Sequence, residues 1–252
     1  MQQATLWAAL GTGFTFLLTA LGAATVFLFR KTLDARIEKV FFGFAAGVMI
    51  AASVWSMLIP AIEDAQALGL PGWLPAAAGF VVGGAGMIFL DWLAARVRGQ
   101  KSRSRTATLF LAVTLHNIPE GMAVGLAFAL AAERMGDAPL LASALALALG
   151  IGIQNFPEGA ALSLPIWQDG KTPGRAFGLS AASGAVEPVF GVLAAVLGVG
   201  VGSLMPWLLA FAAGAMMYVV VEEMLPEAAS RPGTLGALAG FLVMMVLDVA
   251  LG

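Results

Sequence analysis

Two short polar motifs stand in an otherwise apolar sequence. One begins at His116 and reads HNIPEG, and the other begins at Gln154 and reads QNFPEG. Residues four apart share a face of an ideal helix, which places His116 with Glu120 and Gln154 with Glu158. Imidazole and carboxylate side chains together suit Zn²⁺ or Fe²⁺ and tolerate Mn²⁺, whereas oxygen ligands alone suit Ca²⁺ or Mg²⁺ better. His116 therefore favours a transition-metal site.

A proline precedes the glutamate in each motif. Pro119 and Pro157 lack an amide hydrogen, and each clashes with the carbonyl four residues back. Those carbonyls belong to Leu115 and Ile153. We expect both helices to kink there and to leave polar backbone beside the side-chain cluster. Such backbone is tolerated within a membrane only around a protein-lined or water-filled cavity.

Further candidate ligands lie in and around the two motifs. The amides of Asn117, Gln154 and Asn155 offer oxygen atoms beside the glutamates. Glu187, which a proline follows, provides a third acid next to a helix breaker. Met49 lies near the middle of another apolar segment, where its thioether would be a soft additional ligand.

Each of these residues also has a simpler alternative role. His116 could be a structural histidine that is hydrogen-bonded across helices, and Glu120 and Glu158 could relay protons without a metal. The amides could only satisfy backbone groups freed at the prolines. Met49 could pack as an apolar side chain, like most of the twelve methionines in the chain.

The composition excludes several classes of protein. Of the 252 residues, 60% are hydrophobic and 11% are charged, and the mean hydropathy is +0.92. A soluble domain has about a quarter charged residues, so we expect an integral membrane protein. The absence of cysteine excludes thiolate sites, and a single histidine excludes the two that an H-E-x-x-H zinc protease needs. The sequence thus indicates neither an enzyme nor a bound cofactor.

Eight apolar stretches of about 20 residues or more are predicted to span the membrane as helices in one domain, 1–252, of an all-α protein. They run over 4–29, 41–62, 73–97, 107–131, 140–165, 176–200, 204–228 and 233–252. Of the thirteen basic residues, all but Arg134 fall in the loops after the odd-numbered spans. Because cytoplasmic loops carry the positive excess, both termini should lie outside the cytoplasm. These basic loops are interpreted as setting topology, with no nucleic-acid partner.

The acidic residues are distributed differently from the basic ones. Glu120, Glu158 and Glu187 fall well inside the fourth, fifth and sixth spans. A charge at the centre of a membrane helix costs roughly 2.5–3.5 kcal/mol on insertion scales. The sequence places no basic residue at a similar depth, so these acids require protonation, water or a bound cation.

Other acids lie nearer the two membrane surfaces. Asp91, Glu222 and Glu223 are predicted toward the cytoplasm. On the outer side the sequence places Glu63, Asp64 and Asp248. A solvated interface would also explain the cytoplasmic set. Acids at both ends and in the middle nevertheless outline a route for a cation, and basic residues are sparse at its outer mouth.

The paired motifs closely resemble those of the ZIP (Zrt/Irt-like) family of divalent metal transporters, in particular its prokaryotic GufA-like branch. The resemblance covers essentially the whole chain and includes residues 45–63, 184–188 and 213–227. It implies eight helices, with spans 1–3 and 6–8 related as inverted repeats around the central pair of spans 4 and 5. It further implies an elevator-type carrier that imports metal and is a homodimer.

The resemblance also assigns roles to individual residues. It implies the metal ligands His116, Asn117 and Glu120 in span 4, Gln154, Asn155 and Glu158 in span 5, Glu187 in span 6 and Met49 in span 2. It implies the entrance acids Glu63 and Asp248 and the exit acids Asp91, Glu222 and Glu223. Many members have histidine where this chain has Gln154, and some have an acid in place of Asn155.

These observations lead to one functional hypothesis and two rivals. The chain is predicted to import divalent transition metals, with a preference for Zn²⁺ over Cd²⁺, Fe²⁺ or Mn²⁺, across a prokaryotic inner membrane. Its partners would be the metal, the lipid bilayer and a second copy of the chain. Because His116 must be neutral to bind metal, uptake should fall at acid pH. The rivals are a channel-like metal facilitator and a proton-coupled metal exporter.

Overall fold

The computed structural model of the chain describes residues 2–28, 34–98, 105–134, 138–200 and 202–251, and every regular element in these ranges is helical. The elements are α1 (Gln2–Ala23), the 3₁₀ turn η1 (Ala24–Phe27), α2 (Ala35–Ala52), the π-helical turn η2 (Ser53–Leu58), α3 (Ile59–Ala67), α4 (Trp73–Arg98), α5 (Arg105–Glu133), α6 (Ala138–Gln168), α7 (Pro173–Gly184), α8 (Val186–Gly200), the 3₁₀ turn η3 (Gly202–Leu204), α9 (Met205–Val219), the π-helical turn η4 (Val220–Met224), α10 (Leu225–Ala228) and α11 (Arg231–Leu251).

Seven helical stretches within the described ranges are long and apolar enough to cross a membrane. They are Gln2–Phe27, Ala35–Ala67, Trp73–Arg96, Ala138–Gln168, Pro173–Val199, Met205–Ala228 and Arg231–Ala250. α5, which has 29 residues and carries the HNIPEG motif, is not among these seven. The chain is therefore an all-helical, multi-pass membrane protein.

Two differences between the helices and the predicted spans have a clear local origin. The second span begins at Ala35 instead of residue 41, because the Asp34 side chain accepts a hydrogen bond from the Arg36 N–H at 2.8 Å and caps the helix. The sixth span was predicted as one run but is divided, since α7 ends at Gly184 and α8 begins at Val186. The prolines of the two motifs, by contrast, lie inside helices that continue on both sides of them.

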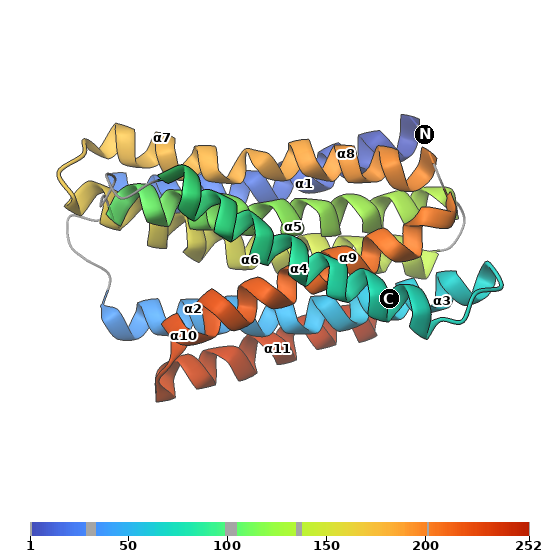
Figure 1. Cartoon of the computed structure of the whole chain (residues 1–252). Helices are drawn as coiled ribbons and strands as arrows, with labels where there is room; N and C mark the ends of the chain where they lie inside the picture. The colour runs from blue at the N-terminus through green and yellow to red at the C-terminus, as the bar shows by residue number, and fades with distance from the viewer. Residues whose placement is uncertain (1, 29–33, 99–104, 135–137, 201, 252) are drawn as a thin grey trace.

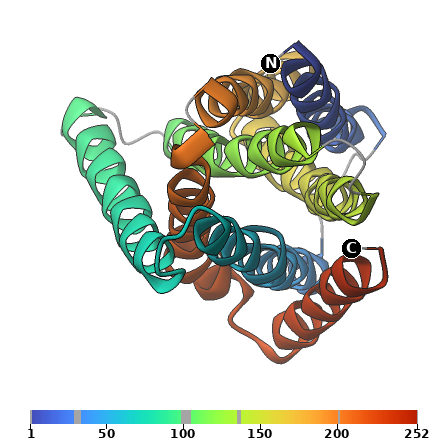
Figure 2. The same cartoon turned by 90° about the vertical axis from the view of Figure 1, so that its right-hand side faces the viewer.

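The helices form two groups that lie side by side (Figures 1 and 2). The motif group consists of α1, α5, α6, α7 and α8, in which α1 packs along α6 and α5 along α8. The flanking group consists of α2, η2, α3, α4, α9, η4, α10 and α11, in which α2 packs along α11 and α4 along α9. The two groups meet mainly where α2 and α11 contact α6 and where α9 contacts α5.

Glycines bring helices of the same group into backbone contact. A Cβ added at Gly47 in α2 would lie 2.0 Å from the Ala237 carbonyl oxygen in α11, and one at Gly159 in α6 would lie 2.1 Å from that of Thr19 in α1. Only glycine permits such an approach between membrane helices. For each described glycine, any backbone atom that an added Cβ would meet belongs to a helix of the same group as the glycine.

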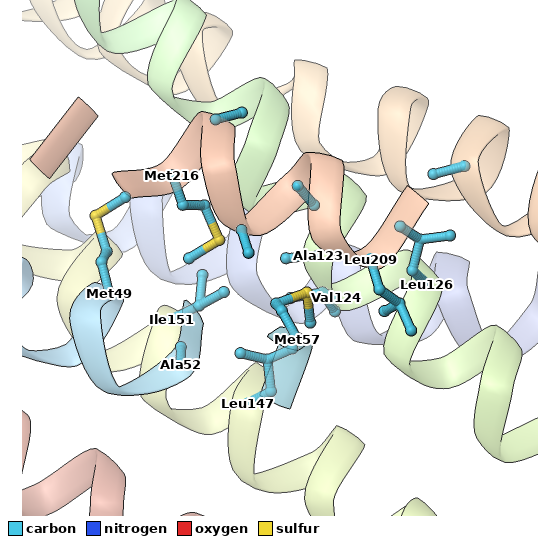
Figure 3. Packing of buried hydrophobic residues seen from close by; sticks show 14 of the residues in the cluster. Met49, Ala52, Met57, Ala123, Val124, Leu126, Leu147, Ile151, Leu209 and Met216 are labelled. Carbon is cyan, nitrogen blue, oxygen red and sulfur yellow. The ribbon is translucent and has the colours of Figure 1, made fainter. Parts of the chain in front are cut away.

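Side chains, in contrast, fill the interface between the two groups. Figure 3 shows Met49, Met57 and Met216 of the flanking group beside Leu147 and Ile151 of the motif group. All five side chains are fully buried. Methionine has three rotatable bonds and adapts to irregular gaps, so this interface can repack more readily than the glycine contacts inside each group.

One end of the molecule carries most of the described basic residues. We call it the basic end; it holds Arg36, Lys39, Lys171, Arg175 and Arg231, which lie where α2 begins, where α6 leads into α7 and where α10 leads into α11 (Figure 1). Arg134, at the end of α5, lies at the opposite end. Arg30, Lys31, Lys101 and Arg103 were part of the same prediction and lie outside the described residues.

Candidate metal site

The two polar motifs face each other in the middle of the motif group. His116, Asn117 and Glu120 on α5 are all buried, and so are Gln154, Asn155 and Glu158 on α6. The Gln154 Nε2 donates a hydrogen bond to Oε1 of Glu120 at 2.9 Å, which connects the two helices directly. The glutamate and amide spacing predicted on each helix thus brings these side chains together.

Most polar atoms in this cluster have no hydrogen-bond partner. They are Glu120 Oε2, both oxygens of Glu158, Gln154 Oε1, Asn155 Oδ1 and both polar atoms of the Asn117 amide. Buried polar groups in proteins are nearly always hydrogen-bonded, and an unpaired one is costly. Nearly all of these atoms have a lone pair to offer, so the cluster is suited to surround a cation.

A cavity connects this cluster to the basic end. It has a volume of about 230 Å³ and is lined by Glu38, Phe42, Val113, His116, Glu158, Ala161, Leu162, Pro165, Glu222, Glu223, Met224, Pro226 and Glu227. His116 and Glu158, which are 4% and 5% exposed, lie at its inner wall. The exposed Glu222 and Glu227 lie at its mouth, so the cavity leads from solvent-accessible acids to buried ligands.

His116 also makes the cluster's contact with the flanking group. Its Nε2 lies 2.8 Å from Oε1 of Glu223, which belongs to η4. Electrostatic interactions further link Glu158 to both His116 and Glu223. A cation at this position would replace an imidazole–carboxylate contact with its own bonds to the same two side chains.

Glu187 is held differently from the other predicted ligands. Its carboxylate accepts hydrogen bonds from Thr15, from Thr19 at 3.2 Å and from the Asn155 amide at 3.0 and 3.1 Å. It also lies in the first turn of α8, where the helix dipole favours a negative charge. In this conformation Glu187 ties α1, α6 and α8 together and does not line the cavity.

Met49 lies in the apolar interface between the two groups. Its side chain is fully buried within the hydrophobic cluster, near Ile151 and Met216 (Figure 3). The Ser53 hydroxyl donates to the Met49 carbonyl oxygen at 2.8 Å, one turn before the π-helical segment. Met49 therefore lies at the contact between α2 and the motif group, with apolar neighbours in this conformation.

The predicted entrance and exit acids occupy separate places. Asp91 accepts a hydrogen bond from the Tyr218 hydroxyl at 2.7 Å and is not part of the cavity lining, unlike Glu222 and Glu223. Asp248 is 5% exposed and accepts from the Ser56 hydroxyl at 2.8 and 3.0 Å. Glu63 is exposed on α3. The structure thus joins two of the three exit acids to the cavity and leaves the entrance acids apart from it.

Among the described residues, no three histidine, aspartate or glutamate side chains lie close enough to hold one metal ion. The predicted ligands instead form two linked sets. His116 and Glu158 face the cavity, whereas Glu120 pairs with Gln154 at a deeper position. Electrostatic interactions connect Glu120 to Glu158 and to Glu187.

Several residues of the site were missed by the sequence analysis. Glu38 and Glu227 line the cavity, and Thr15 and Thr19 bind Glu187. The threonines stand at helical spacing on one face of α1, a polar stripe in a membrane span that could have been noticed. Glu38 stood among basic residues and, by sequence alone, resembled part of a solvated loop.

Comparisons with known proteins identify the family of this chain. A family model described as "ZIP Zinc transporter" matches residues 93–248, which include both motifs. The chain belongs to the ZIP family. It is therefore a transporter and not an enzyme, and the family predicted from the two motifs is confirmed.

The ZIP relatives come from both animals and bacteria. The chain is 37% identical to zinc transporter ZIP11 of Homo sapiens, with 97% of each chain covered. It is 38% identical to zinc transporter GufA of Myxococcus xanthus, covering 93% of this chain and 94% of the relative. It is also 38% identical to zinc transporter ZIPB of Bordetella bronchiseptica, covering 98% and 82%. The similarity therefore extends over nearly the whole chain.

Proposed function

We propose that this chain imports divalent transition metal, with a preference for Zn²⁺, across a prokaryotic inner membrane into the cytoplasm. Metal would pass the entrance acids Glu63 and Asp248, bind at the paired motifs, and leave through the cavity. Cd²⁺, Fe²⁺ and Mn²⁺ would be weaker substrates. The relatives' names as zinc transporters support the choice of metal.

The observation that carries this proposal is the set of buried lone pairs without donors. Six unpaired oxygens come from α5 and α6 alone, and the His116 Nε2, which contacts Glu223, belongs to the same cluster. An imidazole nitrogen combined with carboxylate oxygens is a ligand set that Zn²⁺ favours. His116, Glu120 and Glu158 would be the principal ligands, assisted by Asn117, Gln154 and Asn155. Met49 would join when the two helix groups change their relative position, and Glu187 would join after exchanging its hydrogen bonds within the motif group.

The division into two groups supports alternating access by an elevator-type movement. Glycine contacts hold each group together through its backbone, whereas methionine side chains fill much of the interface between them. The motif group would carry the metal as one body along the flanking group. In the present conformation the cavity connects the ligands to the basic end. We take this end as the cytoplasmic side because basic loops stay in the cytoplasm.

The packing also supports eight spans arranged as an inverted repeat. In such a repeat, span 1 corresponds to span 6, span 2 to span 7, span 3 to span 8 and span 4 to span 5. The packed pair α2–α11 then corresponds to the packed pair α9–α4, and the packed pair α1–α6 corresponds to α8–α5. The π-helical turns η2 and η4 stand in the two corresponding spans, and each leads into a helix with proline at its start. We further propose that both termini lie outside the cytoplasm and that the transporter is a homodimer.

Two rival functions use the same ligands. A channel-like facilitator would pass metal without saturation, and a proton-coupled exporter would move it outward against protons. The interface between the groups favours a carrier over a channel, because the apolar cluster around Met57 and Leu147 blocks a continuous pore in this conformation. Saturable uptake without strict proton antiport would argue against the exporter, and flux that rises linearly with metal concentration would support the channel-like facilitator.

Zinc flux into proteoliposomes tests the proposal. The purified chain should take up Zn²⁺ with saturation, and His116→Ala and Glu158→Gln should each abolish most of this flux. Ser163→Ala is a matched control, since the buried Ser163 hydroxyl on α6 donates only to the Ala160 carbonyl of its own helix, at 3.3 Å. Normal zinc uptake by His116→Ala would overturn the site and with it the proposed mechanism.

A further inference from the structure

The only arginine or lysine that the sequence places away from the basic loops has a specific partner. Arg134, just after α5, donates from its Nη2 to Oδ1 of Asp64 on α3, forming an ion pair at the opposite end of the molecule. Asp64 is only 8% exposed, so its carboxylate is largely removed from water. Arg134 supplies the opposite charge that compensates for this burial.

This ion pair connects the two helix groups. Arg134 follows the last turn of α5 in the motif group, whereas Asp64 belongs to the flanking group. Backbone–glycine contacts within each group would survive a relative movement of the groups, but a contact between Arg134 and Asp64 would not. The pair is therefore sensitive to how the groups are positioned.

The interface between the two groups is open at the basic end and closed at the opposite end. At the basic end, the cavity opens between α2, α5, α6 and the η4–α10 segment and reaches His116 and Glu158. Toward the opposite end, the groups are joined by Arg134–Asp64 and by the Ser143 hydroxyl, which lies 3.4 Å from Asp248. Between these contacts and the metal ligands lies the buried apolar cluster that contains Met57 and Leu147 (Figure 3).

We propose that the Arg134–Asp64 ion pair is a latch that closes the outer end of the transport route while the cavity is open at the basic end. The inference rests on the proposed alternating-access function. When the motif group moves, Arg134 withdraws and leaves Asp64 as a free carboxylate facing the incoming divalent cation. Arg134 and the cation are thus alternative partners of Asp64 in the two halves of the transport cycle.

A thiol reporter behind the latch can test this directly. The chain has no cysteine, so Met57→Cys introduces a single thiol at a fully buried position between the groups. Its reaction rate with a membrane-impermeant methanethiosulfonate reagent, applied from the outer side without metal, reports how often that end opens. Asp64→Asn and Arg134→Gln should each raise this rate about two- to fivefold, the range expected for a partly exposed ion pair.

Control variants separate the latch from general loosening of the fold. Arg134→Lys keeps the charge and should label nearly as slowly as the parent. The exchange Asp64→Arg with Arg134→Asp should restore slow labelling. Gln66→Ala, which shortens a nearby exposed side chain on the same helix, should leave the rate unchanged.

Two results would overturn the latch. One is an unchanged labelling rate in both single variants, and the other is equally fast labelling in Gln66→Ala and Asp64→Asn. Labelling requires no transport, so these results leave the zinc-import proposal intact. Conversely, normal zinc flux through His116→Ala would remove the import mechanism without changing the thiol measurement.

Discussion

The side chains of Gln154 and Glu120 form a hydrogen bond of 2.9 Å that joins the two motif helices, and the second oxygen of Glu120 has no partner. Gln154 therefore fixes the orientation of the glutamate while leaving one carboxylate oxygen available. This is the role that outer partners of metal ligands usually play. The relationship gives Gln154 a positioning function in addition to its own amide oxygen.

Removal of this amide should weaken metal binding without unfolding the protein. In Gln154→Ala, Glu120 loses the group that orients it, and zinc affinity should fall about 10–100-fold, as is typical for partners of metal ligands. The apparent KM for zinc flux in proteoliposomes measures the effect. Ser163→Ala serves as the control on the same helix. An unchanged KM in Gln154→Ala would show that the hydrogen bond does not position a ligand.

Thr15 is predicted to stabilise the fold through Glu187. Thr15→Val keeps the shape of the side chain but leaves Oε2 of Glu187 without this donor, at a cost of about 1–3 kcal/mol for a buried group. Thermal unfolding in detergent should shift to lower temperature. In Thr12→Val the lost hydroxyl donates only to the Ala8 carbonyl of its own helix at 2.6 Å, so the shift should be smaller. Equal shifts in the two variants would contradict this role of Thr15.

Close packing of α5 on α8 depends on Gly125. A Cβ there would lie 2.1 Å from the Gly191 carbonyl oxygen, so Gly125→Ala must push the two helices apart. We expect destabilisation of about 1–3 kcal/mol, the usual cost of overpacking. Gly178→Ala in α7 is the matched control, since a Cβ at that position meets nothing within 4 Å. The melting temperature should therefore fall in Gly125→Ala and stay close to that of the parent protein in Gly178→Ala. An unchanged melting temperature in Gly125→Ala would refute the contact.

Zinc uptake should depend on pH through His116. A protonated imidazole has no lone pair for a metal, so uptake should fall between neutral and acid pH. Initial rates of flux at fixed free zinc measure this profile. The residual flux of His116→Asn should vary less steeply over the same range. Uptake that rises toward acid pH would instead point to proton-driven transport.

The broad architecture could be predicted from the sequence, because hydropathy and charge placement depend on local composition. The all-helical membrane fold and most helix positions follow from apolar stretches, and the paired motifs predicted the family that the comparisons confirm. The break between Gly184 and Val186 and the two π-helical turns were not predicted. They depend on backbone hydrogen bonds that no residue type specifies by itself.

The site was predictable in its residue types but not in its pairings. His116 and Glu158 were singled out individually, whereas the contact of His116 with Glu223 and the pairing of Arg134 with Asp64 join residues far apart in the chain. Arg134 had been noticed only as an exception to the charge distribution. Such partners depend on how α5 packs against the flanking group, which periodicity within one helix does not reveal.

X-ray absorption at the zinc edge tests the central claim most directly. Because the chain contains a single histidine, any imidazole signal from bound zinc in the tag-free protein must come from His116. The account predicts one imidazole nitrogen among oxygen ligands in the parent protein, and an oxygen-dominated shell without imidazole scattering in His116→Ala. A parent spectrum without imidazole, or one unchanged by the substitution, would contradict the assignment of the transported metal to this site.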